Sequence, residues 1–322
     1  MRQIMILVLL AALLCGCSAV DNSDAVADVP AQNQRLTVFT CLEAQVYTPL
    51  VREFQERTGI YVEVRGGSAG ELLENLEGCD VLLGWEADQL EADAEKLRTL
   101  DRELSGNVSS LCPQGETWVP VSIRAMVIVY NPKLVRQNPP ADLESLLQSP
   151  WAGKIAFADP GKNAFSRSVL QVLARGKTGP DPERLRRFAG NLNALLADTE
   201  EVIRSVADGS CCLGVVPEDA ARLWVDSGLD LTVVYPQSGT WMLTEGAAIP
   251  KEAPHPENAR AFLTFLLGEN AQSYGKTNLF RGSVLEKIVT FPENALIYDP
   301  VSAASDREVL MEQWQEIWEE EP

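Results

Sequence analysis

The chain lacks the side chains on which several classes of protein depend. It has one histidine, His255, in 322 residues, which is too few for most acid–base or zinc chemistry. His255 lies between two prolines, and we expect it to be solvated. Cys41 follows a strand-like run but has no evident histidine partner that would make it a nucleophile. The sequence therefore predicts no enzyme, no metal site and no cofactor.

Basic side chains are also scarce. The chain has 27 Lys and Arg against 46 Asp and Glu, which gives a net charge of −19. This excess of negative charge argues against nucleic acid and against an anionic membrane surface as partners. It does not exclude a small anion, because backbone amide groups and one or two arginines are enough to bind one.

Long apolar runs are missing after the first residues. The run 4–14 follows Arg2 and is too short to span a bilayer, so it predicts a secretory signal. The end of this run, Leu14-Cys15-Gly16-Cys17, resembles the bacterial lipobox. That resemblance implies a signal peptide over 1–16 and a lipid on Cys17. An ordinary signal peptide with incidental cysteines is the alternative.

The polar, acidic stretch 17–34 has no periodicity and predicts a flexible tether. We therefore expect a protein of the cell envelope that faces the periplasm or the exterior and contacts the membrane only through its lipid anchor.

Five cysteines remain after the leader, and an odd number leaves at least one thiol unpaired. Their pairing cannot be deduced from the sequence. The apolar context of Cys211 and Cys212 favours buried strand thiols, with a vicinal disulfide or a metal site as alternatives. The five are Cys41, Cys79, Cys112, Cys211 and Cys212.

Strand-like and helix-like segments alternate along the rest of the chain, which predicts an α/β fold. The expected strands include 35–40, 60–64, 80–83, 118–121, 155–159, 232–235 and 246–250. The expected helices include 47–57, 71–78, 164–174, 256–267 and 306–318. Small polar segments follow three of the strands, at Thr40-Cys41, 66–70 and Gly84-Trp85. Because ligands bind at the carboxyl ends of such strands, we expect a site there.

Several strings resemble type II periplasmic binding proteins, and in particular the iron(III)-type solute-binding proteins of ABC importers. They are TVFTCLEAQVYTPLVREFQERTGIYVEVRGGSAGELLENLEGCDVLLGW, RAMVIVYNPKLV, WAGKIAFADPGKNAFSRSVL and VVYPQSGTWMLTEGAAIPKEAPHPENARAFLTFLL. The resemblance covers nearly all of 35–322.

The resemblance implies a two-lobed fold with two parallel or mixed sheets and flanking helices. We expect lobe 1 to comprise 35–124 and 237–322, and lobe 2 to comprise 125–236. Two hinge crossovers near 122–125 and 235–238 would join the lobes, which close over a ligand. The resemblance also implies a permease of the inner membrane as partner, and we expect a monomer. A membrane sensor kinase is an alternative partner.

The ligand is less specified than the fold. Iron-binding relatives use tyrosines, often an adjacent pair in the second domain, because phenolate is a strong ligand for ferric iron. The matching region 214–222 has none, although Glu218 and Asp219 are possible metal ligands. A surface helix start is the more common role for such a pair. None of the six tyrosines is adjacent to another. Ferric iron therefore stands as the alternative to an anion.

An anionic, phosphorylated small molecule fits the residues better. The segment Gly66–Gly70 precedes a helix, whose free amide groups would favour phosphate, although such a segment is often only a turn. The start of the helix at Asn163 offers the same chemistry, and Arg124 offers a bidentate partner or a structural ion pair. Arg281 is a further candidate. The expected ligand-binding residues are Thr40, Cys41, Ser68, Ala69, Gly70, Trp85, Ser122, Arg124, Asn163, Ser166, Thr240 and Trp241.

Overall fold

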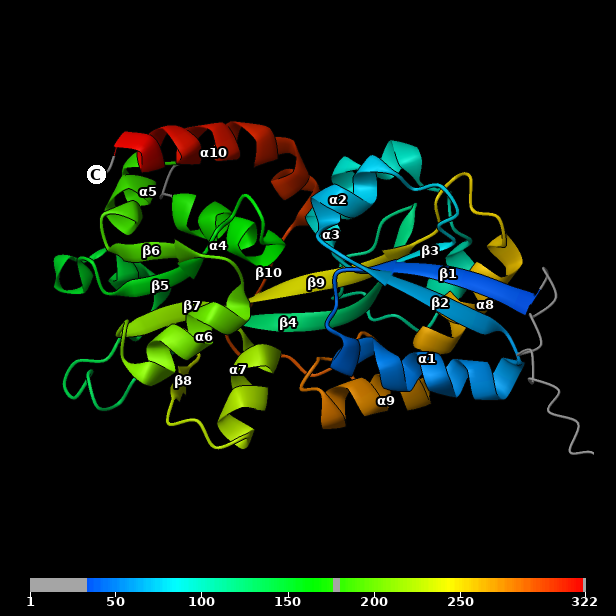
Figure 1. The fold of residues 1–322 in the computed structure, drawn as a ribbon, viewed down its shortest axis with the longest axis horizontal. Coiled ribbons are helices and arrows are strands. Elements are labelled where there is room, and N and C mark those ends of the chain that lie inside the picture. Colours follow the sequence, from blue (N-terminus) through cyan, green and yellow to red (C-terminus); the bar gives the residue numbers. More distant parts are fainter. Residues whose placement is uncertain (1–33, 176–179, 321–322) are drawn as a thin grey trace, which may run out of the picture.

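The computed structural model describes residues 34–175 and 180–320. These residues form two α/β lobes, which Figure 1 shows side by side with two long strands running between them. The predicted two-lobed α/β fold is confirmed. The expected signal peptide, Cys17 and the tether lie outside the described residues. Across the part that is described, no helix combines the length and the apolar character needed to cross a membrane.

The first lobe contains a mixed sheet. Three strands in it are parallel, whereas β9 is antiparallel to both of its neighbours, β3 and β4. The order across the sheet is β2 (Tyr61–Gly66), β1 (Arg35–Thr40), β3 (Val81–Glu86), β9 (Thr240–Ala248) and β4 (Trp118–Tyr130). A short strand, β10 (Ala295–Ile297), pairs with the start of β9.

The second lobe continues from the far half of β4. Residues 118–125 of β4 pair with β9 in the first sheet, and residues 126–130 pair with β7 in the second. The order then runs through β7 (Leu213–Pro217), β5 (Ile155–Ala158) and β6 (Leu192–Leu196), while β8 (Thr232–Val234) pairs with β4. β4 therefore passes from the first sheet into the second between residues 125 and 126.

Helices cover the sheets in both lobes (Figure 1). In the first lobe they are α1 (Ala44–Thr58), α2 (Ala69–Glu74), α3 (Ala87–Ala92), α8 (Pro256–Leu266) and α9 (Glu269–Asn278). In the second lobe they are α4 (Ala164–Ala174), α5 (Pro182–Ala189), α6 (Thr199–Asp208) and α7 (Glu218–Asp226). A long final helix, α10 (Pro300–Glu320), runs along the top of the view in Figure 1. Aromatic side chains join helices to each other and to the sheets, as where Phe54 meets Phe262 with ring centroids 4.9 Å apart.

Local sequence signals explain why several helices begin and end where they do. α1 ends at Gly59, which adopts φ 72° and donates its N–H to the carbonyl of Gln55, as the Thr58-Gly59 pair predicts. α4 begins after Asn163, whose side chain accepts a hydrogen bond from the N–H of Ser166 at 2.9 Å. The expected bounds 164–174 are those of α4.

Two features differ from the expected division into lobes. The return crossover is β9, whose Leu243 belongs to the core of the second lobe and whose Ala247 packs in the core beneath α1 and α8. It does not lie at 235–238, because Pro236 and Gly239 form a turn before the strand starts. The final helix, expected in the first lobe, packs against α4 and α5 as well as against α3. Its apolar residues Leu310, Trp314 and Ile317 cover the second lobe, which explains that placement.

The single histidine is not simply solvated. The backbone N–H of His255 donates to Asp80 at 2.6 Å, and its Nδ1 lies 3.0 Å from the other carboxylate oxygen. Asp80 is fully buried and also accepts from the N–H of Thr37. His255 therefore joins the start of α8 to the sheet. The prolines on either side predicted a solvated side chain, because they give no sign of a partner so far away in the sequence.

The cysteines after the leader are free thiols. Cys211 is buried and Cys212 is partly exposed, and both precede β7 instead of lying within it. The vicinal disulfide is therefore not formed. Cys79, Cys112 and Cys211 are buried thiols, and burial raises the pKa of Cys79 and of Cys112 to about 12.

Candidate functional site

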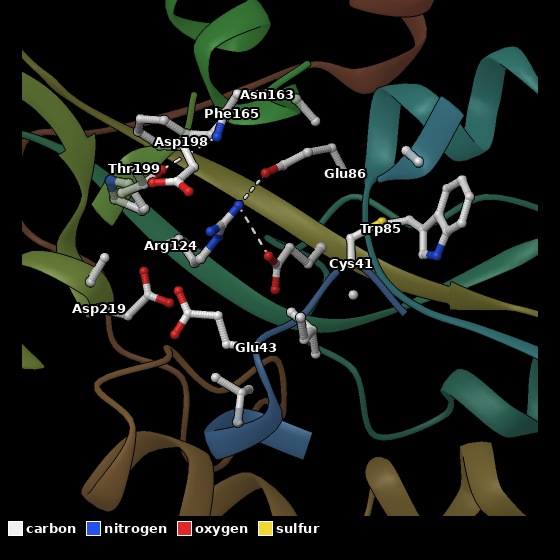
Figure 2. A pocket seen from close by; sticks show the side chains of 18 of the residues that line it. Cys41, Glu43, Trp85, Glu86, Arg124, Asn163, Phe165, Asp198, Thr199 and Asp219 are labelled. Carbon is white, nitrogen blue, oxygen red and sulfur yellow. Dashed lines mark hydrogen bonds and ion pairs between the residues drawn. The ribbon is translucent and has the colours of Figure 1, made fainter. Parts of the chain in front are cut away.

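A cleft of about 420 Å³ lies between the two lobes. The first lobe lines it with the ends of β1 and β3 and the start of α1, and the second lobe lines it with the starts of α4, α6 and α7. Arg124 and Glu245 come from the two crossover strands and lie at its floor. Figure 2 shows side chains from both lobes converging around Arg124. Strand ends and helix starts therefore meet here, as the α/β pattern predicts.

Half of the predicted site residues lie in this cleft, and half do not. Those that line it are Cys41, Ser68, Ala69, Trp85, Arg124 and Asn163. Those outside its lining are Thr40, Gly70, Ser122, Ser166, Thr240 and Trp241.

The residues outside the lining are engaged elsewhere in the fold. The hydroxyl of Thr40 donates to the carbonyl of Leu83 at 2.9 Å and so ties β1 to β3. Ser166 is buried in the first turn of α4. Thr240 is fully buried beside the Pro236 turn. These side chains hold the strand ends and helix starts around the cleft. They were predicted as site residues because they are close in sequence to those strand ends and helix starts.

Trp241 and Gly70 are also placed by local structure. Trp241 is half-buried against the core of the second lobe, under the guanidinium of Arg175 at 5.3 Å from the ring centre. Gly70 lies inside α2, with open space where a side chain would be. Trp85 lines the cleft and is also almost fully buried in the first lobe.

Ser68 is committed to its own helix. Its Oγ accepts from the N–H of Glu71, and its own N–H donates to the Glu71 carboxylate at 3.1 Å, so the two residues form a capping box. The pair therefore places a carboxylate, not an empty anion site, at the start of α2. Residues 66–70 also match the G-x-S-x-G spacing of some hydrolases, but the chain's histidine is bonded to Asp80 and not to Ser68.

Carboxylates outnumber basic groups in the cleft. The six carboxylates that line it are Glu43, Glu86, Asp198, Glu200, Asp219 and Glu245. The three basic side chains that line it are Arg124, Lys162 and Arg281. Sequence reasoning missed most of these acidic groups. Glu86 follows Trp85 at a predicted strand end, and this position was the available signal for it.

Both arginines of the cleft are already paired with carboxylates. Arg124 contacts Glu86 and lies 3.0 Å from Glu245. Arg281 contacts Glu245 and lies 2.6 Å from Asp219. The expected structural ion pair of Arg124 is therefore present, and Arg281 shares it.

Burial shapes the charge state of this cluster. Burial raises the pKa of Glu86 above its usual range, although Arg124 opposes that rise. Burial also lowers the pKa of Arg281 to about 10, against the opposing effect of Asp219. Arg281 is still charged at neutral pH, because this lowered pKa lies well above 7.

The cleft has aromatic walls, but no tyrosine lines it among the residues that the structure describes. Phe165 and Trp224 line it together with Trp85. Tyr235 instead donates to Glu218 at 2.5 Å, outside the cleft, so the adjacent pair Glu218 and Asp219 is divided between two environments. Among residues 34–175 and 180–320, no group of three or more His, Cys, Asp or Glu side chains is close enough to hold a metal ion.

Comparison with known proteins places the chain in a family. Residues 36–276 match the family described as bacterial extracellular solute-binding protein. The chain is 25% identical to iron uptake protein A1 of Synechocystis over 308 residues, which cover 85% of this chain and 82% of that protein.

Solved structures show the same fold. Iron-bound HitA from Pseudomonas aeruginosa superposes with a TM-score of 0.76 at 21% identity, over 88% of this chain and 99% of that one. AfuA from Actinobacillus pleuropneumoniae, solved with fructose-6-phosphate bound, gives 0.80 at 16% identity, over 89% and 99%.

The family match covers most of the chain and agrees with the two-lobed fold and with the cleft between the lobes. A non-enzymatic family also agrees with the prediction that the chain is not an enzyme. The chain therefore belongs to the bacterial extracellular solute-binding proteins, as the solute-binding component of an ABC transporter.

Proposed function

We propose that the protein captures a positively charged solute between its lobes and presents it to the permease of an ABC importer. The observation that carries this proposal is the surplus of carboxylates in the cleft, where both arginines are already paired. Carboxylate oxygens bind hard metal ions and ammonium groups, and aromatic faces add to the binding of organic cations. Ferric iron and an organic ammonium ion share this chemistry.

Ferric iron is supported by the names of the similar proteins, iron uptake protein A1 and iron-bound HitA. Here its ligands would be carboxylates, because the cleft has no tyrosine in its lining. Glu43 lies on the first lobe and Asp219 on the second, and Figure 2 shows both carboxylates pointing into the same part of the cleft. Lobe closure would bring such ligands together, which fits the lack of a three-ligand group among the described residues.

A phosphorylated ligand, which we expected from the sequence, has less support. AfuA with fructose-6-phosphate shows that a protein of this fold binds one. In this chain, however, the capping box occupies Ser68, and carboxylates hold Arg124 and Arg281. An anion would have to displace these partners.

Titration calorimetry on the full chain tests the charge of the solute. The probes are ferric ion supplied as its nitrilotriacetate complex, putrescine and fructose 6-phosphate. We expect one of the two cations to bind and to raise the melting temperature, since a ligand of the native state stabilises it. Bound iron should lack tyrosinate colour. Tight binding of the sugar phosphate with no binding of either cation would overturn the proposal.

Asp198 offers a matched pair of variants. Its side chain accepts from the N–H of Glu201 at 2.9 Å and so caps α6, and it also lines the cleft. Asp198→Asn keeps the cap and removes the charge, so cation affinity should fall while stability is kept. Asp198→Ala should lose the same affinity and in addition about 1 kcal/mol of stability. Unchanged cation binding in both variants would place the solute elsewhere.

We also propose that lipid on Cys17 anchors the protein and that the stretch after it links the lipid to the lobes. This part of the chain lies outside the described residues, and the lipobox resemblance supports it. Replacement of Cys17 by serine should release the protein from the membrane fraction and abolish labelling by a fatty acid. Cys15→Ser serves as the control and should stay anchored. Retention of the Cys17 variant in the membrane would contradict the anchor.

A further inference from the structure

Five side chains, four of them buried and Arg124 nearly so, form a chain of alternating charge across the floor of the cleft. It runs from Asp219 through Arg281, Glu245 and Arg124 to Glu86. Asp219 comes from α7 of the second lobe, and Glu86 from the end of β3 in the first. Glu245 and Arg124 sit on the two crossover strands. The chain therefore links the lobes along the hinge.

Glu245 is the centre of this chain. It is 2% exposed, and its two oxygens face different arginines. Oε1 lies 3.0 Å from Nη2 of Arg124, while Oε2 contacts Arg281 and accepts from the hydroxyl of Ser122 at 2.8 Å. Ser122 in turn accepts from Arg281 at 3.1 Å. One carboxylate thus holds two guanidinium groups at once.

Both guanidinium groups would otherwise be available to a solute. Arg124 and Arg281 line the cleft, and Nε of Arg124 is buried with no hydrogen-bond partner in the described part of the chain. Paired guanidinium groups are strong sites for phosphate and carboxylate. The terminal carboxylate Asp219 also lines the cleft, and its Oδ1 has no partner among the described residues.

We propose that Glu245 determines the charge specificity of the cleft. By holding Arg124 and Arg281, Glu245 keeps both guanidinium groups from binding anions. The carboxylates at the two ends of the chain of alternating charge, Asp219 and Glu86, are then left to bind a cation. The proposal rests on the proposed function for the sign of the natural solute. A purely structural ion cluster gives little net stability compared with apolar packing, so stability alone does not account for burying five charges at a ligand cleft.

Glu245→Gln tests this role, because it keeps the shape of the side chain and removes its charge. Inorganic phosphate is the probe, titrated into the full chain by calorimetry. We expect phosphate affinity to rise at least about tenfold, the worth of one hydrogen bond to a charged group. Affinity for the bound cation, ferric ion supplied as its nitrilotriacetate complex or putrescine, should fall in the same variant. Adding Arg281→Met to Glu245→Gln should abolish the gain for phosphate.

Glu144→Gln is the matched control. Glu144 pairs with Arg184 far from the cleft, so this variant also removes one carboxylate from an arginine. It should leave phosphate affinity at the wild-type level. Phosphate binding by a folded Glu245→Gln protein that is no tighter than by Glu144→Gln would overturn the proposal. If Glu245→Gln does not fold, Glu245→Asp is the second variant, because its shorter side chain withdraws the carboxylate from the two arginines that Glu245 holds. It is expected to raise phosphate affinity in the same direction, and failure to do so counts equally against the proposal.

The two proposals fail separately. A wild-type protein that binds neither cation refutes the positively charged solute. The phosphate comparison between Glu245→Gln and Glu144→Gln still decides whether Glu245 holds the arginines away from anions.

Discussion

At the scale of single residues, Gly84 shows how one backbone conformation aims the cleft. Gly84 has φ 75° and lies where the pairing of β3 with β9 shifts register between Leu83 and Trp85. Such a bulge turns the following side chains, here Trp85 and Glu86, toward the site. The sequence showed the glycine as a loop signal after a strand, but the bulge depends on a partner strand more than 150 residues away.

Gly84→Ala should destabilise the protein more than Gly59→Ala. Both glycines have φ above 70°, so each alanine costs about 1–2 kcal/mol in backbone strain. A Cβ at Gly84 would also lie 2.2 Å from Leu42, whereas a Cβ at Gly59 meets open space. Urea unfolding of both variants measures the difference. Equal losses would show that Leu42 moves aside at no cost.

Asp88 predicts a pH dependence. It is 2% exposed, and burial raises its pKa against the opposing charges of Arg167 and Arg307. The native state therefore binds the Asp88 proton more tightly than the unfolded chain does. As the pH rises from the ordinary aspartate pKa to the raised pKa of the native state, Asp88 lowers the free energy of unfolding. Asp88→Asn should raise the free energy of unfolding at pH 7. That advantage should shrink as pH falls toward the ordinary aspartate value of about 4.

Urea unfolding at a series of pH values compares the two proteins. A variant that is less stable than wild type at neutral pH would mean that the attraction to the two arginines outweighs the cost of burying the carboxylate.

Residue roles were predictable where the partner is near in sequence. Asn163 caps a helix through Ser166, three residues later, and both positions were identified. Glu245 was not identified as a site residue, and Asp219 was named only as a possible metal ligand, because their partners Arg124 and Arg281 lie more than 30 residues away in the chain. Local sequence patterns do not predict such contacts, because only the folded topology brings the five charges together.

At the scale of elements, the alternation of strands and helices predicted β1 and α4 to the residue, since apolar runs with clear ends define both. The placement of α10 could not be predicted in the same way. Its apolar residues fix which of its faces is buried but not which lobe buries it. The structure packs it on α4 and α5 and against α3, so it joins both lobes on a path separate from β4 and β9.

Trp314→Ala should therefore destabilise the second lobe and not only the end of α10. Trp314 is 3% exposed and packs near Phe188, with ring centroids 6.4 Å apart. Loss of a buried tryptophan costs about 3–5 kcal/mol. Val309→Ala, in the same helix but 56% exposed, should change stability by less than about 0.5 kcal/mol. A small loss at Trp314, measured by urea unfolding, would show that α10 is dispensable to the second lobe.

At the scale of the whole molecule, the cleft is divided between the lobes, so a solute held by both must draw them together. β4 and β9 run through the hinge, and α10 packs on both lobes, so closure has to rotate about these three segments. Small-angle scattering should give a smaller radius of gyration with the bound cation than without it. At one hundred times the dissociation constant, the same cation should add about 2.7 kcal/mol to the stability of both lobes together. An unchanged radius of gyration with a bound solute would mean that one lobe binds the solute alone. If that lobe is the first, Asp219→Asn in the second lobe would leave the affinity for the solute unchanged.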